Sequence, residues 1–166
     1  MEVRDERPGE EAEIGALISD AFLTTAHANG TEAQIVEGLR AAAALTHSLV
    51  AVEAGAIVGH IAFSEVLIDG HACGWFALGP VAVIPKRQGE GIGGALVRAG
   101  LARLAVQGAA GCVLVGDPGY YGRFGFAADP ALLVDKVPSE YVLGLALAGP
   151  CVPGVVTHHR AFGLEG

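Results

Sequence analysis

The residues that could do chemistry begin with a glycine-rich stretch, Gln88-Gly89-Glu90-Gly91-Ile92-Gly93, which follows an apolar run and opens a helical pattern. The first turn of a helix leaves backbone N–H groups without partners inside the helix and carries partial positive charge. Glycine adopts positive φ without strain, so the backbone can come close to a ligand. The stretch therefore predicts a site where backbone N–H groups bind a phosphate or another anion.

One class of phosphate site is excluded by the residues that follow. A nucleotide-binding P-loop ends in Gly-Lys-Ser or Gly-Lys-Thr, whereas Gly93-Gly94 is followed by Ala95. A plain turn without a ligand stays open as an alternative, although three glycines in six residues are a costly way to connect a strand to a helix.

A dinucleotide-binding loop is the more serious alternative. Gly89, Gly91 and Gly94 match the spacing G-x-G-x-x-G, and Asp117 stands after the next expected strand, close to where a ribose-binding acid is found in such folds. Two observations count against this class. Polar residues 85–88 separate the preceding strand from the first glycine, and three antiparallel-looking strands precede the loop, which leaves too little chain for a doubly wound sheet.

The elements that must position this loop follow from the periodicity of the apolar residues. Apolar side chains three and four apart predict helices, and Val-, Ile- and Phe-rich runs separated by Ala54-Gly55 and Asp69-Gly70 predict antiparallel strands. Thr31-Glu32-Ala33-Gln34 has the form of a capping box and predicts the start of the second helix. The expected helices cover residues 14–22, 31–39 and 92–107, and the expected strands cover residues 2–4, 48–53, 57–67, 74–84, 112–116, 141–148 and 155–162.

The form Gln-x-x-Gly-x-Gly at residues 88–93 resembles motif A of the GCN5-related N-acetyltransferases (GNAT), which lies between the fourth strand and the third helix of that family. A second resemblance follows it. Residues 120–126 match the family's segment Phe/Tyr-Tyr-x-x-x-Gly-Phe, and residues 116–126 look like the GDPxYYxRFGF signature of a subgroup of predicted N-acetyltransferases. The expected order of helices and strands agrees with that family.

The resemblance implies a fold as well as a ligand. The fold is α+β (a three-layer α/β arrangement), in which a mixed, mostly antiparallel central sheet of about six or seven strands is flanked by helices and splays at its fourth strand. Gly79-Pro80 interrupts the apolar run of that strand, and proline cannot donate to a sheet ladder. We therefore expect a single N-acetyltransferase domain, residues 1–166; an edge-strand proline without a function is the alternative to the splay.

The resemblance also implies that acetyl-CoA is the co-substrate and that it is held by two segments. Its pantetheine arm pairs with the backbone of Val81, Ala82 and Val83, and its pyrophosphate lies on the loop. The loop residues implied in binding are Gln88, Gly89, Glu90, Gly91, Ile92, Gly93 and Gly94.

Tyr121 is the implied catalytic residue, because the family's tyrosine stands four residues before the glycine of its segment. An amine attacks the thioester carbonyl and a thiolate leaves; a phenol with a pKa near ~10 and a thiol with a pKa near ~8.5 are close enough for useful proton transfer. Tyr121 is thus expected to be the general acid, while a main-chain N–H near Val83 polarises the carbonyl. A tyrosine that only binds the cofactor is the alternative. The neighbouring aromatic side chains, Tyr120, Phe124 and Phe126, are expected in the core. Arg123 is expected in solvent.

The general base is not assigned by the sequence. Four side chains lie on or near expected strands, and each fits a surface or hydrogen-bonded polar residue better than a base; ordered water is a standing alternative. These side chains are His60, Glu65, His71 and His159. Many relatives carry an asparagine before the tyrosine, whereas here Asp117-Pro118-Gly119 forms a short connection, so the fourth helix is expected to be about one turn.

Composition sets the remaining expectations. Hydrophobic residues make up 52% of the 166 residues and charged residues 17%, which excludes disorder. Mean hydropathy is +0.48, yet no apolar run reaches the ~18–20 residues of a spanning helix, and the N-terminus lacks an apolar leader, so we expect a cytoplasmic location and no membrane partner. A net charge of −8 argues against nucleic acid. Cys73, Cys112 and Cys151 are far apart, and His158-His159 is adjacent, so no metal site is expected.

The function predicted from these observations is acetyl transfer from acetyl-CoA to an amine. A non-catalytic acyl-CoA sensor on the same fold is the alternative, and a nucleotide-dependent oxidoreductase is the third hypothesis. The acceptor is not identified by the sequence, although residues 21–29 and the C-terminal third are expected to line its site. A monomer or a homodimer fits the chain equally well.

Overall fold

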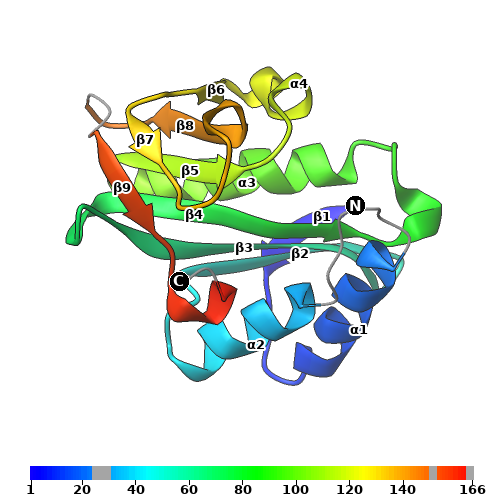
Figure 1. Ribbon diagram of the computed structural model, residues 1–166. Helices are drawn as coiled ribbons and strands as arrows, with labels where there is room; N and C mark the ends of the chain where they lie inside the picture. The colour runs from blue at the N-terminus through cyan, green and yellow to red at the C-terminus, as the bar shows by residue number, and fades with distance from the viewer. Residues whose placement is uncertain (24–30, 150–152, 164–166) are drawn as a thin grey trace. The chain divides into compact units, whose positions relative to one another are not determined.

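The computed structural model describes residues 1–23, 31–149 and 153–163 (Figure 1). Its helices are α1 (Glu11–Phe22), α2 (Glu32–Ala41), α3 (Ile92–Val106) and α4 (Pro118–Tyr121). Its strands are β1 (Glu2–Asp5), β2 (His47–Glu53), β3 (Ala56–Ile68), β4 (His71–Val83), β5 (Gly111–Val115), β6 (Ala127–Ala128), β7 (Leu132–Leu133), β8 (Val142–Ala146) and β9 (Gly154–Thr157). The expected helices and strands are confirmed, with shifts of a few residues at their ends, apart from the last strand: it was expected over residues 155–162 but ends at Thr157, and Arg160–Phe162 form a 3-10 turn.

The sheet is mixed, as predicted. Its hydrogen-bonding order is β1-β2-β3-β4-β5-β8-β6, while β9 pairs with β3 and β7. β4 and β5 are parallel, and so are β7 and β9; the pairs β1–β2, β2–β3 and β5–β8 are antiparallel. Within the described residues, seven strands have four residues or more, which agrees with the expected six or seven. β6 and β7 have two residues each, too few to show a periodicity in the sequence.

The chain forms two compact units. Unit 1 comprises Met1–Phe63 and Gly79–Gly100, and unit 2 comprises Ser64–Leu78 and Leu101–Gly166. β3, β4 and α3 each contribute residues to both units. That residues 1–166 act as one N-acetyltransferase domain stays a prediction.

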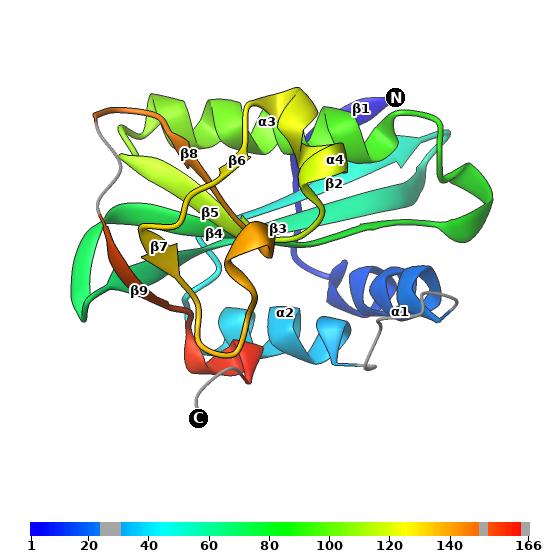
Figure 2. The same cartoon turned by 45° about the horizontal axis from the view of Figure 1, so that its top comes forward.

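Unit 1 is built on the antiparallel strands β1, β2 and β3. Helices α1 and α2 lie on one face of β2 and β3, and the first turns of α3 lie on the other (Figures 1 and 2). The apolar face predicted for α1 is confirmed, because Ile14 and Ile18 are fully buried in a cluster with Val36 of α2 and Val50 of β2. The capping box was wrong: Thr31 precedes α2, but its backbone is in the right-handed helical region and its side chain does not cap the helix.

Unit 2 is built around Trp75, which is fully buried on β4. Its indole ring lies where a side chain on Gly111 of β5 would be, so the glycine lets the two strands and the ring pack closely. The parallel pairing joins Trp75–Ala77 to Gly111–Val113. β4 does not end at Gly79-Pro80 but continues to Val83 in unit 1, and the splay beyond Pro80 stays a prediction.

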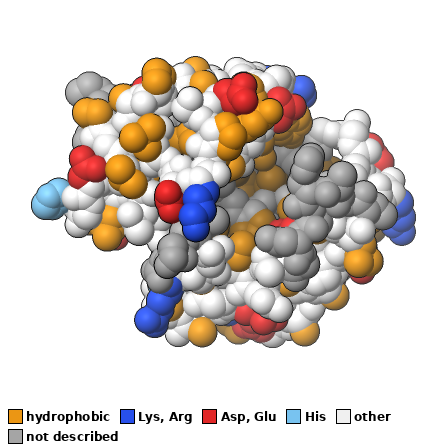
Figure 3. Space-filling model, in the orientation of Figure 1, with side chains coloured by type: hydrophobic (Ala, Val, Ile, Leu, Met, Phe, Trp, Pro, Cys, Tyr) orange, Lys and Arg blue, Asp and Glu red, His pale blue; other side chains and the backbone are white. Residues whose placement is uncertain are grey.

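Apolar side chains on the surface are unevenly distributed. Of the eight large apolar residues that are exposed in the described part of the chain, six belong to unit 2. Figure 3 shows hydrophobic side chains, in orange, scattered over the visible face. The six residues are Leu67, Val106, Val115, Leu133, Tyr141 and Val155.

The described residues contain no helix long and apolar enough to cross a bilayer, and no cluster of three or more His, Cys, Asp or Glu side chains arranged to hold a metal ion. Cys73 is a half-buried free thiol and Cys112 a buried one, while Cys151 lies outside the described residues. The cytoplasmic location stays a prediction.

Candidate active site

The glycine loop has the backbone conformation that its sequence requires. After β4, a short 3-10 turn (Pro85–Arg87) leads into an extended Gln88. Gly89 then has φ +82° and Gly91 has φ +88°, a region that side chains with a Cβ rarely adopt. A Cβ at either glycine would meet nothing within 4 Å. Glycine is therefore needed here for backbone conformation and not for space.

Helix α3 begins directly after this loop. The first helical hydrogen bond runs from the Ala95 N–H to the Gly91 carbonyl, at 3.0 Å. The N–H groups of Ile92, Gly93 and Gly94 therefore have no partner within the helix. The Ile92 side chain is only 3% exposed and anchors the helix start, whereas Gly89, Glu90 and Gly91 are exposed. Backbone N–H groups in an exposed loop at a helix N-terminus form an anion site.

The position of α3 in unit 1 is set by a close approach at Gly100. A Cβ on Gly100 would fall on the ring of Phe63, which is fully buried on β3. The helix therefore lies directly against the aromatic ring. Because the interior is close-packed, this contact fixes where the N-terminus of α3, and with it the glycine loop, stands on the sheet.

Polar contacts connect the loop to the preceding strand. The Gln88 side-chain Nε2 donates to the Val83 carbonyl at 3.1 Å, and the Ile84 N–H donates to the Val58 carbonyl at 3.0 Å. The end of β4 alternates as a strand should, with Ala82 buried and Val81 and Val83 half-buried. The residues predicted to bind acetyl-CoA, 81–83 and 88–94, therefore all lie in unit 1, on one continuous segment that runs from β4 through the loop into α3.

The tyrosine segment of unit 2 forms a single helical turn, as the short connection predicted. Asp117 precedes α4, and its Oδ1 accepts a hydrogen bond from the Gly119 N–H at 2.9 Å. The Asp117 carbonyl also accepts from the N–H groups of Tyr120 and Tyr121, at 3.1 and 3.0 Å. Asp117 therefore caps α4 with its side chain and serves a structural role in this segment.

The ring of Tyr121 is surrounded by other aromatic rings. Its centroid lies 4.9 Å from that of Tyr120 and 6.2 Å from those of Phe124 and Phe126. A Cβ on Gly116 would stand 2.8 Å from Cε2 of Tyr121, so the ring packs against the glycine backbone. Burial, followed by the neighbouring Tyr120, raises the pKa of Tyr121 to about 12. Its phenol therefore keeps its proton at neutral pH.

The neighbours of Tyr121 are partly as expected. Phe126 is buried, with 3% exposure, but Tyr120 and Phe124 are only half-buried, so their assignment to the core was wrong. The exposed Arg123 donates from Nε to the Tyr120 carbonyl at 2.9 Å and lies 4.4 Å above the Tyr120 ring. Arg123 thus braces the segment by a hydrogen bond and a cation–π contact.

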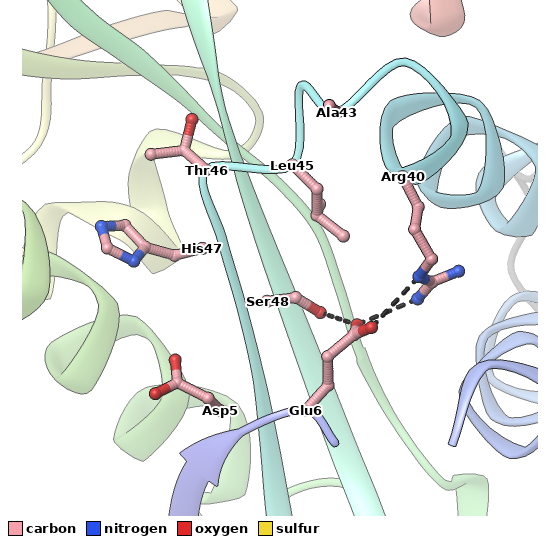
Figure 4. A pocket seen from close by; sticks show the side chains of 8 residues that line it. All are labelled: Asp5, Glu6, Arg40, Ala43, Leu45, Thr46, His47 and Ser48. Atoms are coloured by element: carbon pink, nitrogen blue, oxygen red, sulfur yellow. Dashed lines mark hydrogen bonds and ion pairs between the residues drawn. The ribbon is translucent and has the colours of Figure 1, made fainter. Parts of the chain in front are cut away.

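A polar pocket in unit 1 had no signal in the sequence. It has a volume of about 440 Å³ and lies at the start of β2 (Figure 4). Glu6 accepts from Arg40 and Ser48, and the Ser48 hydroxyl also lies 2.7 Å from Nε2 of the buried His60. The residues that line it are Asp5, Glu6, Arg40, Ala43, Leu45, Thr46, His47 and Ser48. The pocket lies at the His47 end of β2, and the seven residues of this strand place it about 20 Å from Glu53 at the other end.

None of the four residues weighed as a base gains support in the described structure. Burial lowers the pKa of His60 to about 4, and its imidazole bonds Ser48. His159 accepts from the Ala161 N–H at 3.0 Å and so serves as a local cap. Glu65 and His71 are exposed. The base therefore stays unassigned.

Comparison with known proteins identifies the family. The family described as "Acetyltransferase (GNAT) domain" matches residues 2–128. The uncharacterized N-acetyltransferase YhbS of Escherichia coli K12 is 39% identical over 117 residues, which is 70% of each chain. A GNAT family acetyltransferase of Brucella melitensis, whose crystal structure contains acetyl-CoA, is 52% identical with a TM-score of 0.88 over 97% of both chains. The crystal structure of Escherichia coli YhbS, with CoA bound, has 32% identity and a TM-score of 0.89 over 98% of this chain and 91% of that one.

The fold and the sequence therefore agree on the class of protein, an acyltransferase. The chain belongs to the GNAT family of N-acetyltransferases. The predicted family, fold class and enzyme class are confirmed.

Proposed function

We propose that this chain transfers the acetyl group of acetyl-CoA to the amine of an acceptor, with its glycine loop binding the pyrophosphate and Tyr121 acting as the general acid. The observation that carries the proposal is the positive φ of Gly89 and Gly91, in an exposed loop immediately before the N-terminus of α3. Such a loop directs backbone N–H groups at one anion and needs no cationic side chain to do so. The acetyl-CoA and CoA in the two related crystal structures support this choice of ligand.

The proposed reaction is direct attack. A neutral amine adds to the thioester carbonyl, a tetrahedral intermediate forms, and the C–S bond breaks with its electron pair going to sulfur. The sulfur then receives a proton from the Tyr121 hydroxyl, while the acceptor nitrogen loses its extra proton to a base or water. A main-chain N–H near Val83 is proposed to stabilise the developing oxyanion.

The environment of Tyr121 keeps its hydroxyl protonated but also makes it a weak acid. A pKa of about 12 guarantees a protonated donor, but it makes the phenol a weaker acid than a thiol of pKa ~8.5. The proton is therefore proposed to move late, as negative charge builds on sulfur. The hydrogen bond from Tyr121 stabilises that charge before the transfer is complete.

The acceptor is proposed to carry an apolar portion beside its amine. Tyr121 packs against Gly116, whose N–H donates to the Tyr141 carbonyl at 3.0 Å, and Tyr141 is 44% exposed. Val115, which precedes Gly116, is 45% exposed. These exposed apolar residues lie on the segment that leads into α4 and on the segment hydrogen-bonded to it, and exposed apolar surface of this kind favours a ligand that covers it.

The proposal is tested first by binding and then by turnover. Acetyl-CoA and CoA should raise the melting temperature of the protein, because a ligand that binds the folded state stabilises it. NAD and NADP should leave the melting temperature unchanged, because the protein does not bind them. CoA release is then measured over a panel of amines, in pairs that differ by an added aromatic or aliphatic group, at several pH values. CoA release with the apolar member of each pair preferred is the expected result. If CoA stabilises the protein but no amine causes CoA release from acetyl-CoA, the result supports a sensor instead. If neither acetyl-CoA nor CoA stabilises the protein, the whole proposal is contradicted.

A further inference from the structure

The glycine loop contains a carboxylate where its ligand would be anionic. Glu90 stands between Gly89 and Gly91 and is exposed. A negative charge beside a pyrophosphate opposes binding, because like charges at short range repel. Glycines on both sides of Glu90 also make the loop costly to order, since glycine loses more conformational freedom than other residues. Something in the chain must offset both effects if the loop binds a phosphate well.

Arg87 makes the contacts that do this. Its Nε donates to Oε1 of Glu90 at 2.9 Å, and its Nη2 donates to Oε2 of Glu53 at 2.9 Å. Different nitrogens serve the two carboxylates, so both contacts exist at once. Hydrogen bonds to Glu53 and then to Glu90 raise the pKa of Arg87, and the bond to Arg87 lowers the pKa of Glu53.

The two carboxylates belong to different parts of unit 1. Glu53 is the last residue of β2 and pairs with Ala56 of β3, so it is part of the sheet. Glu90 is part of the loop. The backbone of Arg87 is fixed in the 3-10 turn, where its N–H donates to the Ile84 carbonyl at 2.9 Å. Arg87 therefore connects Glu90, in the middle of the glycine loop, to the end of β2 at Glu53, which is 34 residues before Arg87 in the chain.

We infer that Arg87 is a positioning residue for the acyl-donor loop, acting by its bonds to Glu53 and Glu90 and not by contact with phosphate. The inference rests on the proposed function, in which this loop binds the pyrophosphate of acetyl-CoA. The bridge holds the loop in its binding conformation before the ligand arrives, which reduces the ordering cost of binding. It also neutralises Glu90 inside the anion site.

The test is a double-mutant cycle on CoA affinity, measured by calorimetry. Arg87→Ala should weaken CoA binding about tenfold, because it frees the loop and leaves Glu90 without its counter-charge. Glu90→Gln alone should weaken binding less than Arg87→Ala does, since it loses one bond but also one negative charge. Arg87→Ala combined with Glu90→Gln should recover about half of the loss on a logarithmic scale. An arginine that binds phosphate predicts instead that Arg87→Ala costs the same with or without Glu90, and that result overturns the inference.

Two further variants separate this role from general charge and from folding. Lys86→Ala removes the same charge one residue away and should change CoA affinity by less than about twofold; an equal loss there overturns the inference. Glu53→Gln approaches the bridge from the sheet and should weaken CoA binding about threefold, with far-UV circular dichroism unchanged. In turnover, each weakening should appear in KM for acetyl-CoA and leave kcat unchanged.

The outcomes also distinguish the inference from the function beneath it. Wild-type protein that binds CoA while Arg87→Ala binds equally well contradicts the positioning role alone. Wild-type protein that does not bind CoA contradicts the proposed function, and the positioning role falls with it.

Discussion

Unit 1 and unit 2 each contain residues proposed to take part in acetyl transfer, and the two sets of residues are held by different means. In unit 1 the proposed binding groups are backbone N–H groups, held by two glycines with positive φ, a helix start and ionic contacts at the loop. In unit 2 the proposed reacting group is one phenol, surrounded by three aromatic rings and packed on a glycine. The backbone N–H groups do not titrate, whereas the pKa of the phenol depends on how well its surroundings exclude water.

The difference predicts which structural change abolishes the proposed role of each unit. A backbone anion site is lost when the loop changes conformation, even if no side chain that contacts the ligand is altered. The function of a half-buried phenol is lost when its single hydroxyl is removed, even if the surroundings are intact. Substitutions in unit 1 should therefore affect affinity for acetyl-CoA, and substitutions at Tyr121 should affect the rate of the chemical step.

The largest effect is expected from Tyr121→Phe. Removal of the hydroxyl should lower kcat about 100-fold, the lower end of what a general acid contributes, because the raised pKa already limits the acid. The ring and its packing remain, so the Kd for acetyl-CoA should change by less than about twofold. Both quantities are measured with an acceptor found in the amine panel.

Tyr120→Phe is the matched control, since Tyr120 lies in the same helical turn with its ring 4.9 Å away. Its kcat should stay within about twofold of wild type. Equal losses in the two variants, or a loss of acetyl-CoA affinity in place of rate, contradict the general-acid role and favour a tyrosine that only binds the donor.

The sequence was sufficient for the parts of the site that depend on neighbouring residues. The positions of Gly89 and Gly91 reveal the loop because positive φ and a helix start are local requirements. The single turn of α4 follows from Asp117-Pro118-Gly119 for the same reason. The periodicity of apolar residues likewise predicted α1 and α3, because each helix buries one face.

Other parts depend on contacts that no local pattern contains. Arg87 and Glu53 are 34 residues apart, and Ser48 and His60 are 12 apart, so their pairing follows only from the order and register of the strands. The raised pKa of Tyr121 depends on packing that no residue type specifies by itself. Thr31 shows the opposite error, since the capping-box pattern is present but the backbone does not adopt the cap conformation.

The next largest effect is expected from the two glycines that lie under aromatic rings. Gly100→Ala places a Cβ on the ring of Phe63 in unit 1, and Gly111→Ala places one on the ring of Trp75 in unit 2. Both rings are fully buried and cannot move into solvent. Each substitution should lower the free energy of unfolding by about 2 kcal/mol, measured by chemical denaturation.

The two variants should differ in function, which sharpens the comparison between the units. Gly100→Ala shifts the helix that carries the loop and should also weaken CoA binding, whereas Gly111→Ala should leave CoA affinity unchanged at a temperature where both are folded. Equal CoA affinities in the two variants contradict the view that the contact of α3 with Phe63 sets the loop position.

The third effect concerns pH, and it compares a buried histidine in each unit. Burial lowers the pKa of His60 in unit 1 to about 4, although the Glu6 carboxylate acts in the opposite direction, and burial lowers the pKa of His158 in unit 2 to about 4. In the unfolded chain both should titrate near 6.5. Between these values the unfolded state binds more protons, so stability is lost as pH falls from 6.5 towards 4.

Each histidine should contribute a loss of nearly 2 kcal/mol between about pH 7.5 and about pH 5. His60→Gln and His158→Gln should each remove that share of the pH dependence, measured by denaturation at a series of pH values. Because His60 bonds Ser48 and His158 lies 5.0 Å from the Phe162 ring, His60→Gln should also destabilise more at neutral pH. A pH dependence that is the same in both variants and in wild type shows that neither histidine is neutral and buried in the way the structure indicates.

The smallest effect is expected from Gly91→Ala, and it isolates backbone conformation from every other property of the loop. A Cβ at residue 91 would meet nothing within 4 Å, so no clash accompanies the substitution. The φ of +88° would nevertheless cost an alanine about 1–2 kcal/mol. The free loop can relax away from this strain, whereas the bound loop cannot, so CoA affinity should fall about tenfold with kcat unchanged.

Gly122→Ala in unit 2 is the matched control, because its φ is −57° and a Cβ there also meets nothing within 4 Å. It should leave CoA affinity within about twofold of wild type. If Gly91→Ala binds CoA as tightly as Gly122→Ala does, the positive φ is not needed in the bound state, and the loop would have to hold its ligand by side chains. The site in unit 1 would then resemble the one in unit 2, and the distinction between a backbone site and a side-chain site would be lost.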